Sequence, residues 1–120
     1  PSGVRLAPAY DMVCIPALKD AQLSSTLAMA VGDAFTVAEI TPFDWAQLGQ
    51  QAGVRPSAMA QQMTSLIGKV TEALKAASEV AQQRGGGQDT IYAVSQHVIE
   101  ACDRHRTATT QVKAIKPDWL

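Results

Sequence analysis

Asp11, which follows Tyr10 in a proline-containing stretch, carries a side chain that could do chemistry. A carboxylate is a hard oxygen ligand of the kind that holds Mg²⁺ beside nucleotide phosphates, so Asp11 could serve phosphoryl transfer. A lone Asp after a proline is also a common turn or cap residue. Spacing alone leaves both interpretations open.

A second set of candidate ligands lies near the C-terminus. Cys102 and His105 are spaced by one helical turn, and His97 precedes them by further turns. A structural metal needs about four ligands, so we interpret this set as part of a solvated helix end. Cys14 has no Cys or His nearby in sequence, and we expect it and Cys102 to be buried, reduced thiols.

Two further groups of side chains have a binding and a structural interpretation. The last sixth of the chain is locally basic, which could serve an acidic partner or phosphate, or could complement a helix C-terminus. Without aromatic interleaving or a helix-turn-helix pattern, we expect at most weak direct contact with nucleic acid. Methionines at helical spacing could line an adaptable groove, but we expect ordinary core. The two groups are Arg104, His105, Arg106, Lys113 and Lys116, and Met29, Met59 and Met63.

Composition narrows the class of protein. Of the 120 residues, 47% are hydrophobic and 18% charged, which excludes a disordered chain. The net charge of −1 gives no overall attraction to nucleic acid or an anionic membrane. There is no membrane-spanning apolar run and no export signal, so we expect a cytoplasmic protein without membrane contact. The chain begins at Pro1 and not at methionine, so we expect a piece of something longer.

Residues 1–40 predict an irregular lead-in followed by a hairpin. Each proline pushes its predecessor away from helical geometry. Farther on, Leu27, Met29 and Val31 alternate with alanines, and Gly32 begins a two-residue loop typical of a type II′ turn. An isolated hairpin is marginal in water, so it must pack on something else.

Residues 41–106 predict three helices. Thr41 is a good N-cap, Pro42 suits the first helical position, Asp44 completes a capping box, and Gly53 suits a left-handed end. A second helix follows, because apolar residues recur every three or four positions until three glycines stop it. The recurring residues are Met59, Met63, Leu66, Ile67, Val70, Leu74, Ala77 and Val80.

A third helix begins near Gln88, with Asp89 as the expected N-cap. Its expected apolar face consists of Ile91, Val94, Val98, Ile99 and Cys102. The two long helices should pack antiparallel, with the first helix across one end, and Gly68 could mark a close crossing. We expect residues 107–120 to form a tail. The fold class is therefore mainly α, a small helical unit with a short β-hairpin near the N-terminus, in one domain over 1–120.

Two strings carry a resemblance to a known family. Leu6-Ala7-Pro8-Ala9-Tyr10-Asp11 and Leu27-Ala28-Met29-Ala30-Val31-Gly32 resemble the C-terminal portion of HipA-type serine/threonine kinases, the toxins of toxin–antitoxin pairs. The similarity extends from about Val4 to Gly53. It implies that Tyr10 and Asp11 match the Tyr-Asp pair that takes the role of the Asp-Phe-Gly motif of ordinary protein kinases. Asp11 would then be the magnesium ligand.

The resemblance also implies a function for the intact parent. The parent would use Mg and ATP to phosphorylate a serine or threonine of a protein substrate, with an antitoxin-type DNA-binding protein as partner. This chain would supply the metal ligand and the helical floor of the C-lobe. No Gly-rich phosphate loop, strand lysine or His-x-x-x-Asn loop precedes Asp11 in the sequence, so we expect no catalytic residue, tightly bound nucleotide or activity in the chain alone. The alternative is a non-enzymatic helical interaction module that docks a DNA-binding regulator.

Overall fold

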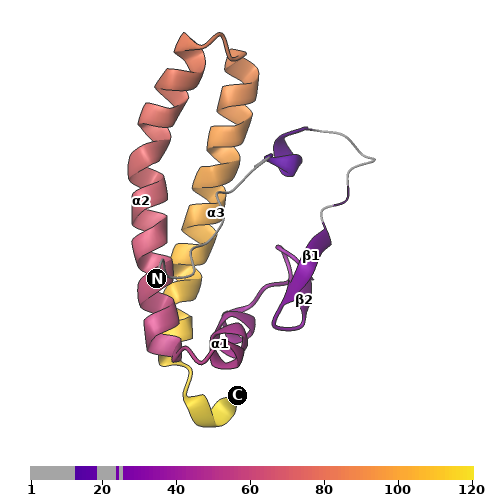
Figure 1. The fold of residues 1–120 in the computed structure, drawn as a ribbon, viewed down its shortest axis with the longest axis vertical. Coiled ribbons are helices and arrows are strands. Elements are labelled where there is room, and N and C mark those ends of the chain that lie inside the picture. The colour runs from indigo at the N-terminus through magenta and orange to yellow at the C-terminus, as the bar shows by residue number, and fades with distance from the viewer. Residues whose placement is uncertain (1–12, 19–23, 25) are drawn as a thin grey trace, which may run out of the picture.

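The computed structural model describes residues 13–18, 24 and 26–120. It is mainly helical, with a two-stranded antiparallel hairpin before the helices, as the sequence predicted (Figure 1). The elements, in chain order, are the short 3-10 helix η1 (Ile15–Leu18), β1 (Thr26–Val31), β2 (Ala34–Thr36), α1 (Pro42–Gln51), α2 (Pro56–Gln83), α3 (Gln88–Ala114) and the 3-10 helix η2 (Pro117–Trp119).

The helices α2 and α3 run side by side in opposite directions, and α1 lies across the end where α2 begins and α3 ends (Figure 1). The helix α2 ends at Gln83, just before the three glycines. The N-cap of α3 is Gly87, so the expected cap at Asp89 was wrong. Asp89 instead lies in the first turn, where a negative charge suits the helix dipole.

The third helix is longer than the sequence indicated. It continues through the polar stretch that we assigned to a tail and ends at Ala114. The hydroxyl of Thr109 donates to the carbonyl oxygen of Arg106 at 2.7 Å, so it is satisfied within the helix. Thr109 and Val112 are buried, and burial of this turn outweighs the weak helix propensity of threonine.

The buried core of the described residues lies at the end of the helix pair where α1 crosses it. It contains one residue from each helix, Ala46, Ala60 and Val112, and we call these three the basal core. Two alanines let the three backbones approach closely around the one larger side chain. The partly buried residues packed around the basal core are Trp45, Met59, Met63, Ile115 and Leu120, which confirms the core interpretation of Met59 and Met63.

The core-facing stripe of α2 is narrower than its sequence pattern suggested. Ile67 is buried, but Leu66 is 62% exposed, so its assignment to the core face was wrong. Outside its own stretch of helix, no atom of the described residues lies within 4 Å of a Cβ built on Gly68, so no described neighbour crosses closely there. Val80 on α2 and Ile99 on α3 are also exposed. With one partner helix, an α-helix buries only part of the apolar positions that its period marks.

The predicted cap of α1 is confirmed. Thr41 and Asp44 form a reciprocal capping box, Pro42 occupies the first turn, and Gly53 follows the helix with φ +71°. In the hairpin, Val31 pairs with Ala34 across the predicted two-residue loop, and the ladder becomes irregular toward Thr26. Met29 is 80% exposed, so the core interpretation of this methionine was wrong.

Candidate functional site

Tyr10 and Asp11, the proposed nucleotide and magnesium site, lie outside the described residues. The described chain begins two residues later, at Val13. The next element, η1, lies against α3. Val13 and Ile15 share a cavity lining with His97 and Arg104 of α3. The described segment that begins at Val13 therefore lies beside the part of α3 that carries these two side chains.

Asp44 joins the hairpin to α1. One of its carboxylate oxygens accepts hydrogen bonds from the backbone N–H of Thr41 at 2.7 Å and from the Thr41 hydroxyl at 2.5 Å. The other accepts from the backbone N–H of Asp33 at 3.2 Å. Gly32 sits so close that a Cβ there would lie 2.6 Å from Asp44 Oδ1, and its φ is +59°. A glycine in the turn thus lets the hairpin dock on the start of α1.

The charge of Asp44 is stabilised by the same contacts. Burial acts to raise its pKa, but the hydrogen bonds from the Thr41 hydroxyl and from the backbone N–H groups of Thr41, Asp33 and Asp44 itself outweigh burial and lower the pKa. The ionised carboxylate of Asp44 therefore connects the hairpin turn to the start of α1 through hydrogen bonds. We assign Asp44 no chemical role.

His105 packs α3 onto α1. Its ring meets the ring of Trp45 edge to face, with centroids 5.7 Å apart and an interplanar angle of 81°. Burial lowers the pKa of His105, and the positive charge of Arg104 lowers it further. The neutral imidazole is therefore favoured in the fold, which suits a packing role.

Among the described residues, no three His, Cys, Asp or Glu side chains lie close enough together to hold a metal ion. Cys102 and His105, the predicted one-turn pair, are accompanied by no third such ligand in this part of the chain. Cys14 and Cys102 are free thiols, and both are half-buried where we expected full burial.

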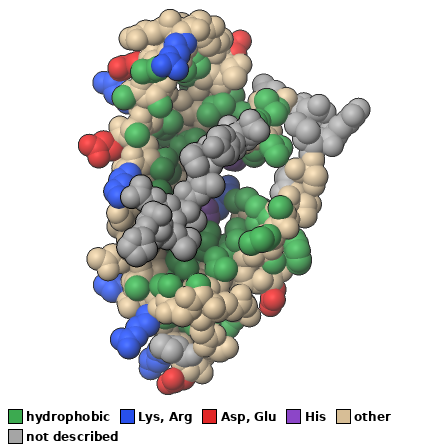
Figure 2. Space-filling view, in the orientation of Figure 1, with side chains coloured by type: hydrophobic (Ala, Val, Ile, Leu, Met, Phe, Trp, Pro, Cys, Tyr) green, Lys and Arg blue, Asp and Glu red, His purple; other side chains and the backbone are tan. Residues whose placement is uncertain are grey.

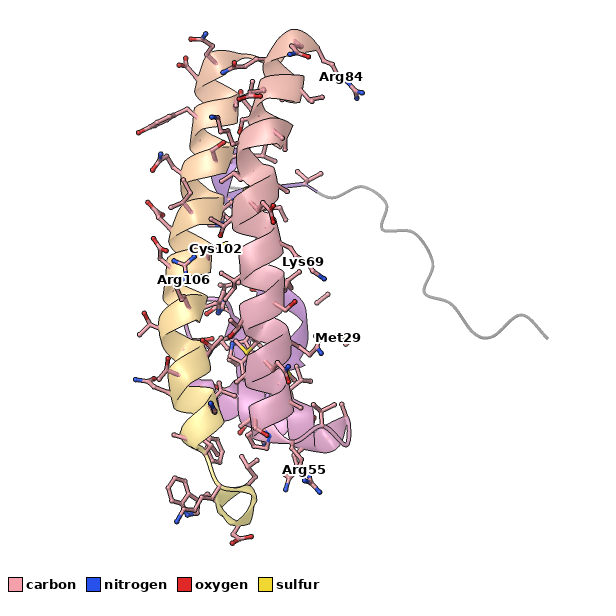
Figure 3. The ribbon with its side chains drawn as sticks, turned by 90° about the vertical axis from the view of Figure 1, so that its left-hand side faces the viewer. Met29, Arg55, Lys69, Arg84, Cys102 and Arg106 are labelled. Atoms are coloured by element: carbon pink, nitrogen blue, oxygen red, sulfur yellow. The ribbon has the colours of Figure 1, made fainter. Side chains whose placement is uncertain are left out.

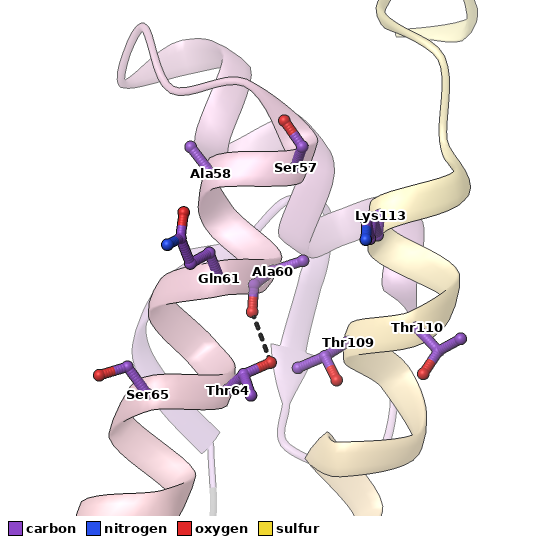
Figure 4. A pocket seen from close by; sticks show the side chains of 9 residues that line it. All are labelled: Ser57, Ala58, Ala60, Gln61, Thr64, Ser65, Thr109, Thr110 and Lys113. Carbon is purple, nitrogen blue, oxygen red and sulfur yellow. Dashed lines mark hydrogen bonds between the residues drawn. The ribbon is translucent and has the colours of Figure 1, made fainter.

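A groove of about 760 Å³ runs between the start of α2 and the end of α3 (Figure 4). Its walls carry mostly small and hydroxyl side chains, and the hydroxyls of Thr64 and Thr109 donate to carbonyl oxygens of their own helices, at 2.9 and 2.7 Å. Lys113 is the charged residue of the lining. The groove brings no acid, imidazole or thiol together with these hydroxyls, so we assign it no chemistry.

The basic side chains of the described chain do not gather into one patch. Figure 3 shows Arg55, Lys69 and Arg84 pointing outward at three separate levels along the helix pair. In the basic C-terminal stretch, Arg106 pairs with Asp103 at 2.5 Å. The ammonium of Lys116 lies 5.5 Å from the ring centroid of Trp119.

Comparison with known proteins gives one kind of evidence about function. No family model matches the chain, and no solved structure matches it significantly. The chain is similar to a protein of Sinorhizobium fredii named "Putative kinase Y4mE", with 32% identity over 72 residues. The match covers 60% of this chain and 17% of that protein. The chain thus corresponds to a small part of a longer protein whose name describes it as a kinase.

The helices of the described residues include none that is both long enough and apolar enough to cross a membrane. The long helices α2 and α3 carry charged residues at intervals along their length. Charged side chains at the centre of a membrane-spanning helix cost free energy, and these charges explain why neither long helix is apolar enough to span a membrane.

Three features of this region were not foreseen from the sequence. They are the docking of the Gly32 turn on Asp44, the contact between Trp45 and His105, and the approach of η1 to α3. Each joins residues far apart in sequence, so only covariation between the paired positions could have signalled them.

Proposed function

We propose that this chain is the C-terminal helical part of a HipA-like serine/threonine kinase, the toxin of a toxin–antitoxin pair. The observation that carries the proposal is the Leu6-x-Pro8-x-Tyr10-Asp11 string, followed by a hairpin and a mainly helical unit. The similarity to a kinase-named protein supports it. Residues 1–120 would then form one subdomain of a larger catalytic domain.

In this proposal Asp11 holds Mg²⁺ next to the phosphates of ATP, and Tyr10 belongs to the same nucleotide site. The metal would neutralise charge on the phosphate oxygens while the γ-phosphoryl group moves to a protein hydroxyl. The general base and the phosphate-binding loop would come from sequence before Pro1. The partner would be an antitoxin-type DNA-binding protein.

The test uses the longest gene product that contains this sequence. Wild-type protein with radiolabelled ATP and Mg²⁺ should label itself or a protein substrate, and Asp11→Asn should abolish labelling while the melting temperature stays nearly unchanged. Asp89→Asn is the matched control and should retain full labelling, because Asp89 is an exposed acid in the first turn of α3. Full labelling by the Asp11→Asn variant would reject the metal role.

A second candidate is a non-enzymatic helical module that docks a DNA-binding regulator. The observation in its favour is that apolar side chains of the hairpin, Met29 and Phe35, are exposed at 80% and 55%. This candidate wins if the longest gene product begins near Pro1 and transfers no phosphate. It fails if the same product phosphorylates a protein in an Asp11-dependent reaction.

A further inference from the structure

A hollow of about 390 Å³ lies between η1, the hairpin and α3 (Figure 2). Its apolar side is formed by residues from three segments, among them Ile15, Leu27 and Val37. Its polar side is formed by His97 and Arg104, which are two helical turns apart on α3 and so share one face. The volume lies within the range of small-molecule sites, which are mostly apolar with a few convergent polar groups.

Arg104 brings to this hollow a positive charge that no carboxylate of the described residues pairs with. Its neighbour Arg106, by contrast, is paired with Asp103. A guanidinium presents parallel N–H donors that match the two oxygens of a carboxylate. The imidazole of His97 can add a further donor on the same side.

We propose that this hollow binds a small amphipathic carboxylate of medium chain length, with its charged head on Arg104 and His97. The apolar body lies among Ile15, Leu27 and Val37. An uncharged apolar molecule would not use the donors of the guanidinium, and a bare phosphate would leave the apolar side uncovered. The proposal does not depend on kinase activity.

The first experiment compares ligands by isothermal titration calorimetry on the full chain. Octanoate should bind with one site per chain, and octanol and acetate should bind at least about tenfold more weakly, because each lacks one half of the recognition. Equal binding of octanoate and octanol would overturn the role of Arg104. Equal binding of octanoate and acetate would overturn the role of the apolar side.

The second experiment locates the site with two pairs of variants. Arg104→Gln should weaken octanoate binding by about tenfold, whereas Arg106→Gln, on the same helix, should change it by less than about twofold. Val37→Asp should weaken binding through charge repulsion, whereas Met29→Asp should not, because Met29 is 80% exposed and does not line the hollow. Circular dichroism and melting curves check that all four variants fold. Binding unchanged in Arg104→Gln, or absent in the wild type, would overturn the proposal.

Discussion

The two ends of the α2–α3 pair are built differently. At the basal end, where α1 crosses, Ala46, Ala60 and Val112 are buried together. At the distal end, near the loop between the long helices, no described residue of α2 beyond Ile67 and none of α3 before Thr109 is buried. The helices meet there through half-buried side chains and through a contact of 3.1 Å between the hydroxyls of Ser78 and Ser95.

This difference shows that a third helix, and not the length of the pair, determines where the pair has a core. Two helices alone can bury only the narrow seam between them, whereas α1 closes a third side at the basal end. Hydrophobic stabilisation scales with the apolar area removed from water. The basal end should therefore carry most of the stability, and the distal end should open at lower cost.

The largest difference in stability should appear between two single valine-to-alanine variants, one at each end of the helix pair. Val112→Ala removes two methyl groups from a fully buried site and should lower the free energy of unfolding by about 2–3 kcal/mol. Val80→Ala, at a position 44% exposed, should cost less than about 0.5 kcal/mol. Urea titration measures both. Similar losses in the two variants would break the contrast between the ends.

A smaller effect should separate two acids in the first turns of helices. Asp44→Ala removes the carboxylate that caps α1 and accepts from Asp33, so it should cost about 1–2 kcal/mol. Asp89→Ala, at the distal end, breaks no cap hydrogen bond of α3 and should cost less than about 0.5 kcal/mol. Thermal denaturation at neutral pH gives both values. An equal or larger loss of stability in Asp89→Ala would contradict the role of Asp44 in connecting the hairpin to α1.

Gly68→Ala should stabilise the protein. The glycine lies within α2, and a Cβ there contacts no neighbour among the described residues, so alanine should add about 0.5–1 kcal/mol through its higher helix propensity. Gly32→Ala is the contrasting control, since its Cβ would collide with Asp44, and it should destabilise the hairpin. A loss of stability in Gly68→Ala would indicate a close neighbour at this position and would sharpen the view of the α2 surface.

The smallest effect concerns pH at the junction of α1 and α3. Because burial, and then Arg104, lower the pKa of His105 in the fold, the unfolded chain binds the proton more readily. This contribution to stability is present above the unfolded pKa of about 6.5 and is lost as pH falls below it through the lowered folded value. His105→Gln should reduce the drop in melting temperature between about pH 7.5 and pH 5.5. An unchanged drop in melting temperature would show that protonation of His105 does not affect the stability of the junction between α1 and α3.

Much of the local structure could be predicted from particular residues. Thr41, Pro42, Asp44 and Gly53 specify the ends of α1, because capping depends on groups within one turn of each other. The hairpin turn at Gly32 and the stop of α2 before the glycines follow from the same short-range rules. The end of α3 was missed because a threonine-rich stretch has weak helix propensity and became helical through burial.

The candidate site was only partly accessible to the same reasoning. The string that ends in Tyr10 and Asp11 is a short-range signal, so the sequence carries the kinase proposal, and the described residues begin after it. The placement of Arg104 and His97 opposite Ile15 and Leu27 has no such signal. Those residues are separated by the whole of α1 and α2, so their approach depends on packing.

By itself, the sequence determined the type and order of the elements, since helix caps, turns and apolar periods act over a few residues. The tertiary structure alone decided which of the marked apolar positions are buried. Leu66 and Ile67 are both apolar and adjacent, yet the first is 62% exposed and the second 8%. The reason is geometric, because the period of a helix defines a stripe, and only the position of the neighbouring helices decides which edge of that stripe is covered.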